Sequence, residues 1–149
     1  MAIANTNRSK FLRVGAAVLL VLLLSAALTS CRSSNQAQVA SLVNQTRAQY
    51  GRSYLRDNWQ LDQKAQAWAN HLANIGRLAH SNLASGITYQ WRALAENVGY
   101  GPSISAVHSA YMNSTGHRAN ILDRRWNYLG TGAAWRGSRV YTVQVFMQY

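Results

Sequence analysis

The stretch YLGTGAAWRGSRVYTVQVFMQ, residues 128–148, predicts two β-strands joined by a tight turn. The turn falls at residues 136–138, Arg-Gly-Ser, between two runs with the alternation typical of strands. Bulky side chains occupy both faces of the second run: Val140, Thr142, Gln144 and Phe146 on one, Tyr141, Val143, Val145 and Met147 on the other. We therefore expect this strand to be central in its sheet and covered on both sides.

The residues before this hairpin predict helices. Apolar side chains recur at helical spacing in residues 37–50 and, most clearly, in residues 61–78. A third helix is expected to begin after Pro102, with Ser103 as its N-cap. Since the helices come first and the hairpin comes last, the pattern predicts an α+β domain built in layers.

Two segments between these elements have no clear period. Residues 80–101 are rich in turn-forming residues, and we expect a long irregular segment there, of the kind that is usually functional or disordered. Its aromatic residues argue against disorder. Residues 117–122, HRANIL, are expected to form a short helical turn.

The N-terminal 30 residues are typical of an export signal. Three cations and no acid precede VGAAVLLVLLLSAAL, an apolar run of 15 residues that is too short for a comfortable membrane span. The run ends in LTSC, residues 28–31, which resembles the lipobox of bacterial lipoproteins. That resemblance implies cleavage before Cys31 and lipidation of its thiol. The alternative is an ordinary signal peptide with an unrelated cysteine.

The resulting organisation has three parts: a signal peptide at residues 1–30, a lipidated tether at residues 31–36 and one domain at residues 37–149. We expect an extracytoplasmic protein anchored to a bacterial membrane through Cys31. Cys31 is the only cysteine, so an intramolecular disulfide is excluded. The lack of internal repeats favours a single domain, and we expect a monomer.

The net charge of +11 falls to +8 when the three cations of the signal segment are removed. A basic exported domain favours anionic lipids or anionic envelope polymers as partners. Arginines such as Arg118, Arg124, Arg125, Arg136 and Arg139 would supply this charge. General arginine enrichment and solubility are the alternative explanation. Nucleic acid is not expected as a partner, because the aromatics fall mostly at helical core spacing and the signal directs the chain out of the cytoplasm.

Three titratable residues differ from the others in their context. Glu96 lies in ALAENVGYG, where a carboxylate is expected to be partly buried and to need a partner. His80 and His117 lie in breaks between elements. Imidazoles commonly bind zinc, and a nearby carboxylate can bind the metal or accept a proton from its water. There is no HExxH motif, so separate structural roles for the three residues are the alternative.

Five motifs in order resemble the CAP superfamily, which is the SCP/PR-1-like family of cysteine-rich secretory proteins, antigen 5 and pathogenesis-related 1 proteins. They are AHSN, AENVGYG, YMNSTGHRANIL, LGTGAA and YTVQVF. The chain is most similar to the short bacterial branch without disulfides, over residues 37–148. The resemblance implies a three-layer α–β–α sandwich with a cleft lined by two histidines and two glutamates. In some members the histidines bind zinc or another divalent metal.

Carried over to this chain, the histidines are His80 and His117 and the first glutamate is Glu96. The second glutamate position is occupied by Ser114, so the site has less negative charge to hold a dication and lacks a two-carboxylate mechanism. The resemblance also implies that Asn120 and Gln144 are buried hydrogen-bonding residues behind the cleft.

Two functions remain open, and the sequence does not decide whether the protein is an enzyme. The first is a tethered module that binds a lipid or an anionic envelope polymer in a cleft lined by His80, Glu96, Ser114 and His117, with or without a divalent metal. The second is a metal-assisted hydrolase, in which the two histidines hold the metal and Glu96 is the catalytic general base. A Ser114 nucleophile is a weaker variant, because a turn-capping serine explains the same position.

Overall fold

The computed structural model describes residues 32–149, so the predicted signal peptide and Cys31 lie outside the described residues. The described elements are α2 (Ser34–Gln49), β1 (Arg56–Asp57), α3 (Trp59–Ile75), β2 (Ala93–Gly101), α4 (Ile104–Asn113), α5 (Thr115–Leu122), β3 (Tyr128–Arg136) and β4 (Arg139–Gln148). None of the helices within residues 32–149 is long and apolar enough to cross a membrane.

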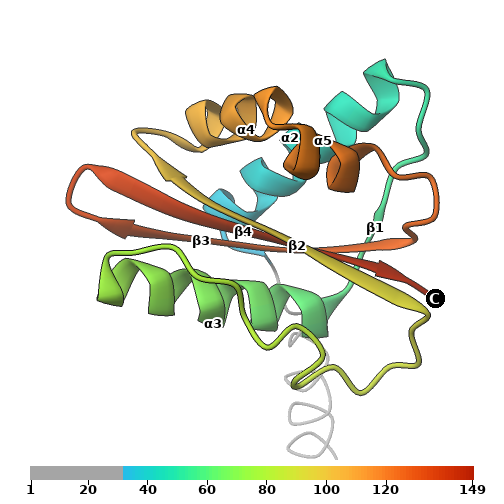
Figure 1. The fold of residues 1–149 in the computed structure, drawn as a ribbon, viewed down its shortest axis with the longest axis horizontal. Coiled ribbons are helices and arrows are strands. Elements are labelled where there is room, and N and C mark those ends of the chain that lie inside the picture. The colour runs from blue at the N-terminus through green and yellow to red at the C-terminus, as the bar shows by residue number, and fades with distance from the viewer. Residues whose placement is uncertain (1–31) are drawn as a thin grey trace, which may run out of the picture. The chain divides into compact units, whose positions relative to one another are not determined.

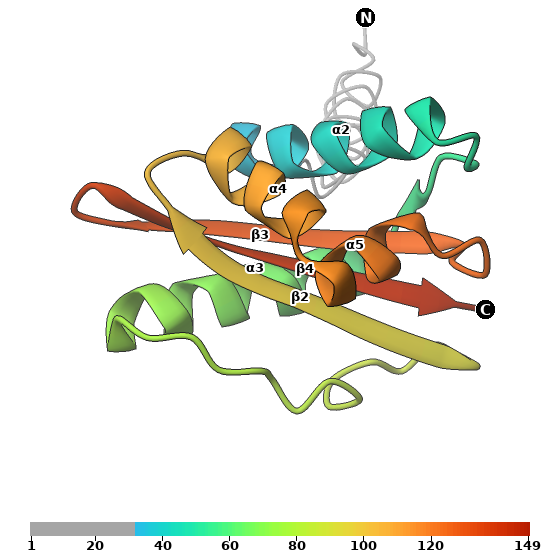
Figure 2. The same cartoon turned by 45° about the horizontal axis from the view of Figure 1, so that its top comes forward.

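The four strands form one sheet that lies between two helical layers. Its order is β1-β3-β4-β2, with β1 parallel to β3 and the other two pairings antiparallel. Helix α3 packs on one face, and α2, α4 and α5 cover the other (Figures 1 and 2). The expected α–β–α sandwich is confirmed, as is the central position of the last strand.

Alternation along β4 divides the interior into two cores. Val140 and Phe146 pack against the layer of α2, α4 and α5, whereas Tyr141, Val143 and Val145 pack against α3. Both sets are almost completely buried. The period of two that the sequence shows in this strand therefore corresponds to two real packing faces.

Helix α3 lies against β3 with almost no side chain between them. A Cβ atom built on Gly130 would lie 2.1 Å from the backbone carbonyl carbon of Leu61, and one on Gly132 would lie 2.1 Å from the carbonyl oxygen of Ala65. Ala65 itself is fully buried. The glycines of the LGTGAA motif are thus explained by direct contact between the helix backbone and the strand.

The outer edge of β3 is hydrogen-bonded by side chains from the helices, because β1 pairs with only its first two residues. Asp62 accepts a hydrogen bond from the Thr131 amide at 2.8 Å, and Gln36 donates to the Thr131 carbonyl at 2.8 Å. Further along, the Gln66 amide accepts from Ala133 N at 3.2 Å and donates to Ala133 O at 3.0 Å. Most proteins cover or interrupt such an edge, and here three side chains satisfy it.

The first helix begins three residues earlier than predicted. Ser33 and Gln36 form a reciprocal capping box, which starts α2 at Ser34. Arg32 donates through Nε to both carboxylate oxygens of Asp62, at 3.0 and 2.9 Å. Residues 32–36 therefore belong to the folded domain, and the prediction of a polar tether reaching residue 36 is wrong for these residues.

Strand β2 lies in a segment that was expected to be irregular. Ala93–Gly101 pairs with β4 along its whole length. Its sequence, ALAENVGYG, is poor in β-branched residues, and strand propensity depends strongly on what a strand packs against.

Helix α3 also ends at Ile75, before the predicted limit, because Gly76 adopts a left-handed conformation (φ 70°) that forms the C-cap.

Candidate functional site

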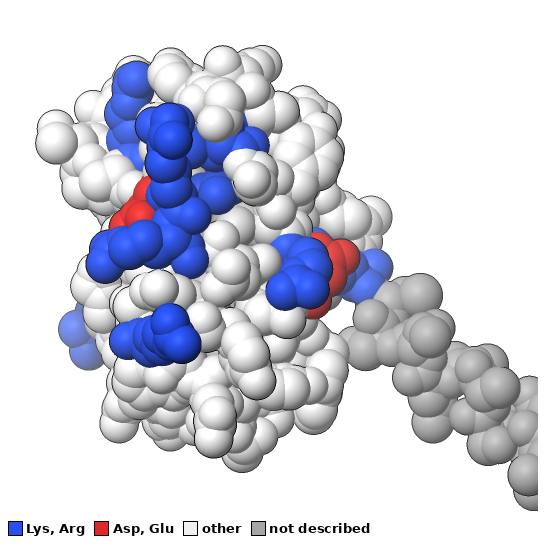
Figure 3. All heavy atoms as spheres, turned by 90° about the vertical axis from the view of Figure 1, so that its right-hand side faces the viewer, with Lys and Arg blue, Asp and Glu red and all other residues white. Residues whose placement is uncertain are grey.

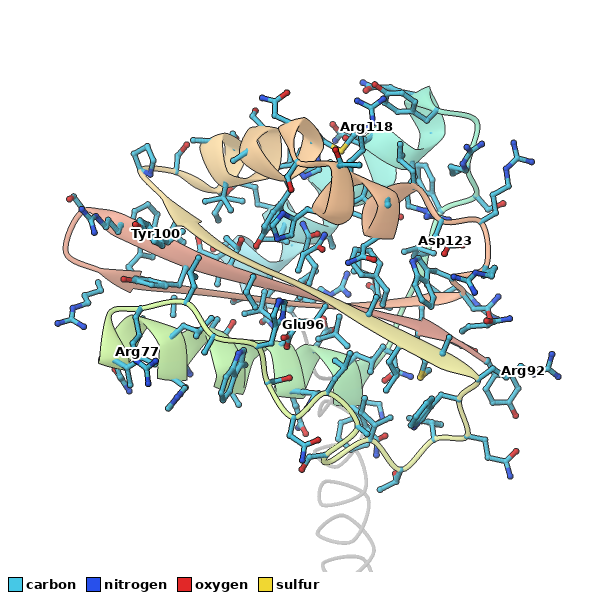
Figure 4. All side chains as sticks on the ribbon, viewed as in Figure 1. Arg77, Arg92, Glu96, Tyr100, Arg118 and Asp123 are labelled. Atoms are coloured by element: carbon cyan, nitrogen blue, oxygen red, sulfur yellow. The ribbon has the colours of Figure 1, made fainter. Side chains whose placement is uncertain are left out.

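His80 and Glu96 form a hydrogen-bonded pair. His80 lies in the segment between α3 and β2, and its Nδ1 is 2.8 Å from Oε1 of Glu96. The backbone amide of Ser81 donates to the same oxygen at 2.9 Å. The Glu96 side chain is 3% exposed and the His80 side chain 64% exposed. The buried carboxylate of Glu96, which Figure 4 labels on β2, therefore orients an imidazole that is open to solvent.

His117 forms a second pair with Ser114 at the start of α5. Its Nδ1 lies 2.9 Å from Ser114 Oγ. The imidazole also packs on the ring of Tyr111, with 4.9 Å between the ring centroids. Ser114 is the N-cap residue of α5, but its side chain makes no capping hydrogen bond. The serine thus positions the imidazole rather than the end of the helix.

A buried amide network lies behind His117. Asn97 donates to the backbone carbonyl of His117 at 3.1 Å and to Gln144 Oε1 at 3.0 Å, and it accepts from Asn120 at 2.9 Å. Gln144 and Asn120 have the hydrogen-bonding roles that the family resemblance implied. Asn97, which connects them and is fully buried, was missed. Its sequence signal is a second polar residue directly after Glu96 in an otherwise apolar run.

The two pairs share one electrostatic environment. Burial lowers the pKa of His117, and the charge of His80 lowers this pKa further. Burial also raises the pKa of the Tyr111 hydroxyl, with a smaller contribution in the same direction from the Glu96 carboxylate. The charge of His80 thus acts on His117, whereas a common cleft lined by His80, Glu96 and His117 stays a prediction.

The hydrogen bonds fix which ring nitrogens are free for a ligand. An ionised carboxylate can only accept, so the Nδ1 of His80 carries the proton toward Glu96, and the lone pair of the neutral ring is on Nε2. His117 also uses Nδ1 within the domain, in its contact with Ser114. His80 can therefore offer Nε2 to a metal ion or to a hydrogen-bond donor, and His117 can do so in the tautomer whose Nδ1 donates to Ser114.

The arrangement limits what Glu96 can do. Its Oε1 is occupied by His80 and Ser81, and its Oε2 is buried without a hydrogen-bond partner among the described residues. Within residues 32–149 no group of three or more His, Cys, Asp or Glu side chains could hold a metal ion together. Glu96 is thus placed behind His80 as an orienting group.

A Ser-His-Glu triad is not assembled, because Ser114 contacts His117 whereas Glu96 contacts His80.

The arginines that were expected to supply positive charge are dispersed over the surface. Arg118 lies over the ring of Tyr50, and Arg125 pairs with Asp123 at 2.7 Å. Figure 3 shows the end of the molecule on the right-hand side of Figure 1, where basic side chains form several separate patches with few acidic atoms.

Comparisons with known proteins agree with this architecture. The model of the cysteine-rich secretory protein family, CAP, matches residues 40–148. No curated protein matches the chain in sequence.

Three solved structures share the fold. An extracellular protein of Bacillus anthracis with an SCP domain is 20% identical with a TM-score of 0.65, over 77% of this chain and 40% of that protein. An outer surface protein of Borrelia burgdorferi is 17% identical (TM-score 0.64, 75% and 90% covered). Venom allergen-like protein 4 of Schistosoma mansoni is 13% identical (TM-score 0.66, 78% and 90% covered). This chain thus spans less than half of the Bacillus protein.

Proposed function

The chain belongs to the cysteine-rich secretory protein family, CAP, and on this premise we propose that it is a membrane-tethered, extracytoplasmic binding protein. Its ligand is held by the Nε2 atoms of His80 and His117. The tether is the lipidated Cys31 of the lipobox-like segment. The matched proteins of Bacillus and Borrelia are described as extracellular and outer surface proteins, which supports a location outside the cytoplasm.

The observation that carries the proposal is the way both histidines use Nδ1 internally. Hydrogen bonds of 2.8 and 2.9 Å hold the two rings through Nδ1, which leaves Nε2 of each ring for an external group. Fixed rings bind with little loss of side-chain freedom. The shared electrostatic environment also favours the neutral form of His117, which is the form that binds a metal or accepts a hydrogen bond.

The proposed site would offer a divalent metal two histidine ligands, and within residues 32–149 no group of three or more His, Cys, Asp or Glu side chains could hold such an ion. His80 and His117 would be its ligands, and Glu96 would fix the orientation of His80 in the manner of carboxylate–histidine–zinc arrangements. When bound, such an ion supplies a positive centre with open positions for an anionic group. The net charge of +8 for the exported part of the chain favours the same ligand class, an anionic lipid or envelope polymer.

Binding is favoured over hydrolysis by the position of Glu96. A general base has to reach the proton that it accepts, directly or through one water. The Glu96 side chain is 3% exposed and is engaged by its neighbours. The absence of a second carboxylate at position 114 removes the other candidate base.

The test compares zinc-dependent thermal unfolding of the full chain with that of three variants. We expect zinc to raise Tm for the wild type and for His71→Gln, an exposed histidine on α3 that serves as the control. The rise should be lost in the double variant His80→Gln with His117→Gln. Glu96→Gln should weaken zinc binding by about 10- to 100-fold, as loss of an orienting group does. An equal rise in all variants would contradict the assignment of the site.

Two further measurements test the membrane anchor and the class of ligand independently of each other. Mass spectrometry of the membrane fraction should find a lipid mass on Cys31, and Cys31→Ser should release the protein from that fraction. Vesicles that contain phosphatidylglycerol should retain a Cys31→Ser protein better than neutral vesicles do, and the double histidine variant should lose this difference. Retention that does not depend on the histidines would place the anionic ligand elsewhere.

A further inference from the structure

A groove outside the imidazole pair lies between α3 and the segment of residues 76–92, which runs beside that helix in Figure 1. It has a volume of about 580 Å³ and opens to solvent. The function proposed above does not use its aromatic and amide side chains. This groove contacts the imidazole site only at its border, through Ser81.

Aromatic rings form the floor and one end of the groove. The Trp68 ring is stacked on His71 with 4.6 Å between centroids and 24° between planes. Its indole N–H donates to the Ala79 carbonyl at 2.9 Å, which fixes the ring in place. Trp59 lines the same groove and is 48% exposed. The Trp68 ring is half-buried: it packs against the core beneath α3 and also lines this groove.

Polar side chains fix the other wall before any ligand binds. Gln60 donates to the Thr88 hydroxyl at 2.6 Å. The Lys64 ammonium donates to the carbonyl oxygens of Asn82 and Ser85 at 2.8 and 2.9 Å. These contacts hold the loop against α3. An ammonium has three donors, so Lys64 keeps one for a ligand in the groove.

A second hollow of about 500 Å³ is lined by Tyr89, Trp91, Arg92 and their neighbours. The indole N–H of Trp59 donates to the Tyr89 hydroxyl at 3.3 Å and so connects the two linings. Arg92, labelled in Figure 4, directly precedes β2 and lines this second hollow. Cations but no Asp or Glu side chains are present in either lining.

From this lining we propose that the groove binds a glycan, a neutral or acidic saccharide chain. A pyranose ring presents an apolar C–H face that suits the flat face of an indole, and hydroxyls at its rim that suit amides and an ammonium. The exposed ring of Trp59 and the fixed groups of Gln60 and Lys64 offer this combination. An acyl chain is a poorer fit, because the first lining has one alanine as its only aliphatic side chain and the second has none.

The charge of the lining narrows the class of saccharide that the groove can bind. Lys64 and Arg92 are the charged side chains of the two hollows. Acidic groups such as uronates or saccharide-linked phosphates are thus attracted, and basic sugars are disfavoured. The second binding surface is therefore complementary to acidic polysaccharide outside the cell.

The test is calorimetric titration of the full chain with two probes, a β-1,4-linked N-acetylglucosamine tetramer and a galacturonate tetramer. We expect saturable binding of at least one probe, weakened by about tenfold or more in Trp59→Ala through loss of the ring face. Trp135→Ala is the matched control, because Trp135 is 49% exposed and lies on the β3–β4 hairpin. Lys64→Met should weaken galacturonate binding more than N-acetylglucosamine binding.

Three outcomes would overturn the proposal. The first is that neither tetramer shows saturable binding. The second is that the Trp59 and Trp135 variants lose binding equally. The third is that anionic vesicles bind in a way that requires Trp59 but is not displaced by either tetramer. The double histidine variant should keep saccharide binding. Its loss there would mean that the probe occupies the imidazole site. Unchanged Tm values in the tryptophan variants would show that the domain stays folded.

Discussion

Replacing Gly132 with alanine tests the packing of α3 on β3. The added Cβ would lie 2.1 Å from the carbonyl oxygen of Ala65, 2.3 Å from its carbonyl carbon and 2.5 Å from the amide nitrogen of Gln66. Real Cβ contacts under 3.0 Å essentially do not occur. All three atoms belong to the backbone of α3, so no side-chain rotation can relieve the overlap. The helix has to move away from the sheet by roughly 1 Å, which loosens the contacts in this core.

Overpacking of a core costs about 1–3 kcal/mol, and we expect the upper end of that range because the helix moves as a unit. A change of 1 kcal/mol shifts the Tm of a domain of this size by roughly 3–6 °C. Gly132→Ala should therefore lower Tm by about 10 °C or more in calorimetry. Gly116→Ala is the matched control. Nothing lies within 4 Å of its Cβ, and alanine should stabilise α5 by about 0.5–1 kcal/mol. A Gly132→Ala protein that unfolds within about 2 °C of the wild type would refute the backbone contact.

Three other changes have expected outcomes. Asp62→Ala leaves the buried amide of Thr131 without its acceptor. It should lower the free energy of unfolding by about 3 kcal/mol or more in urea titration. An unchanged free energy of unfolding would contradict this role of Asp62. Arg47→Ala removes the donors for three carbonyl oxygens at 2.7–2.9 Å and should cost about 3–5 kcal/mol in the same assay. Burial and the charge of His80 lower the pKa of His117. The unfolded chain thus takes up this proton at higher pH than the folded protein. The stability should fall as pH drops below about 6.5, less steeply in His117→Gln. NMR titration of His80→Gln should show a raised pKa for His117, and an unchanged value would exclude the interaction.

The elements with a strong internal period were predictable from the sequence. Strand β4 and helix α3 were identified because bulky or apolar side chains recur at spacings of two and of three to four residues. Strand β2 was not predictable from the sequence, because its glycines, alanines and polar residues show no such period. It forms because β4 offers nine consecutive pairing positions. That information lies 39–55 residues further along the chain.

The pairings within the candidate site were not predictable from the sequence. The family motifs placed His80, Glu96 and His117 together. Whether Glu96 faces a ligand or the back of His80 depends on hydrogen-bond geometry at the scale of tenths of an ångström, which no spacing encodes. Asp62 is a similar case. It lies in the first turn of α3, but its Oδ1 accepts from the amide of Thr131, 69 residues away, a partner that no local pattern indicates.

The side chains of Gln36, Asp62 and Gln66 do more than stabilise the native sheet. They occupy the positions where a strand from another molecule would bind, so they act as a barrier to self-association while α2 and α3 stay docked. A mutation that loosens the packing of α3 on β3, such as Gly132→Ala, would make it easier for this strand edge to open before the whole domain unfolds. Destabilised forms of this protein should therefore aggregate through intermolecular β-pairing at β3, at temperatures where much of the native helix is still present.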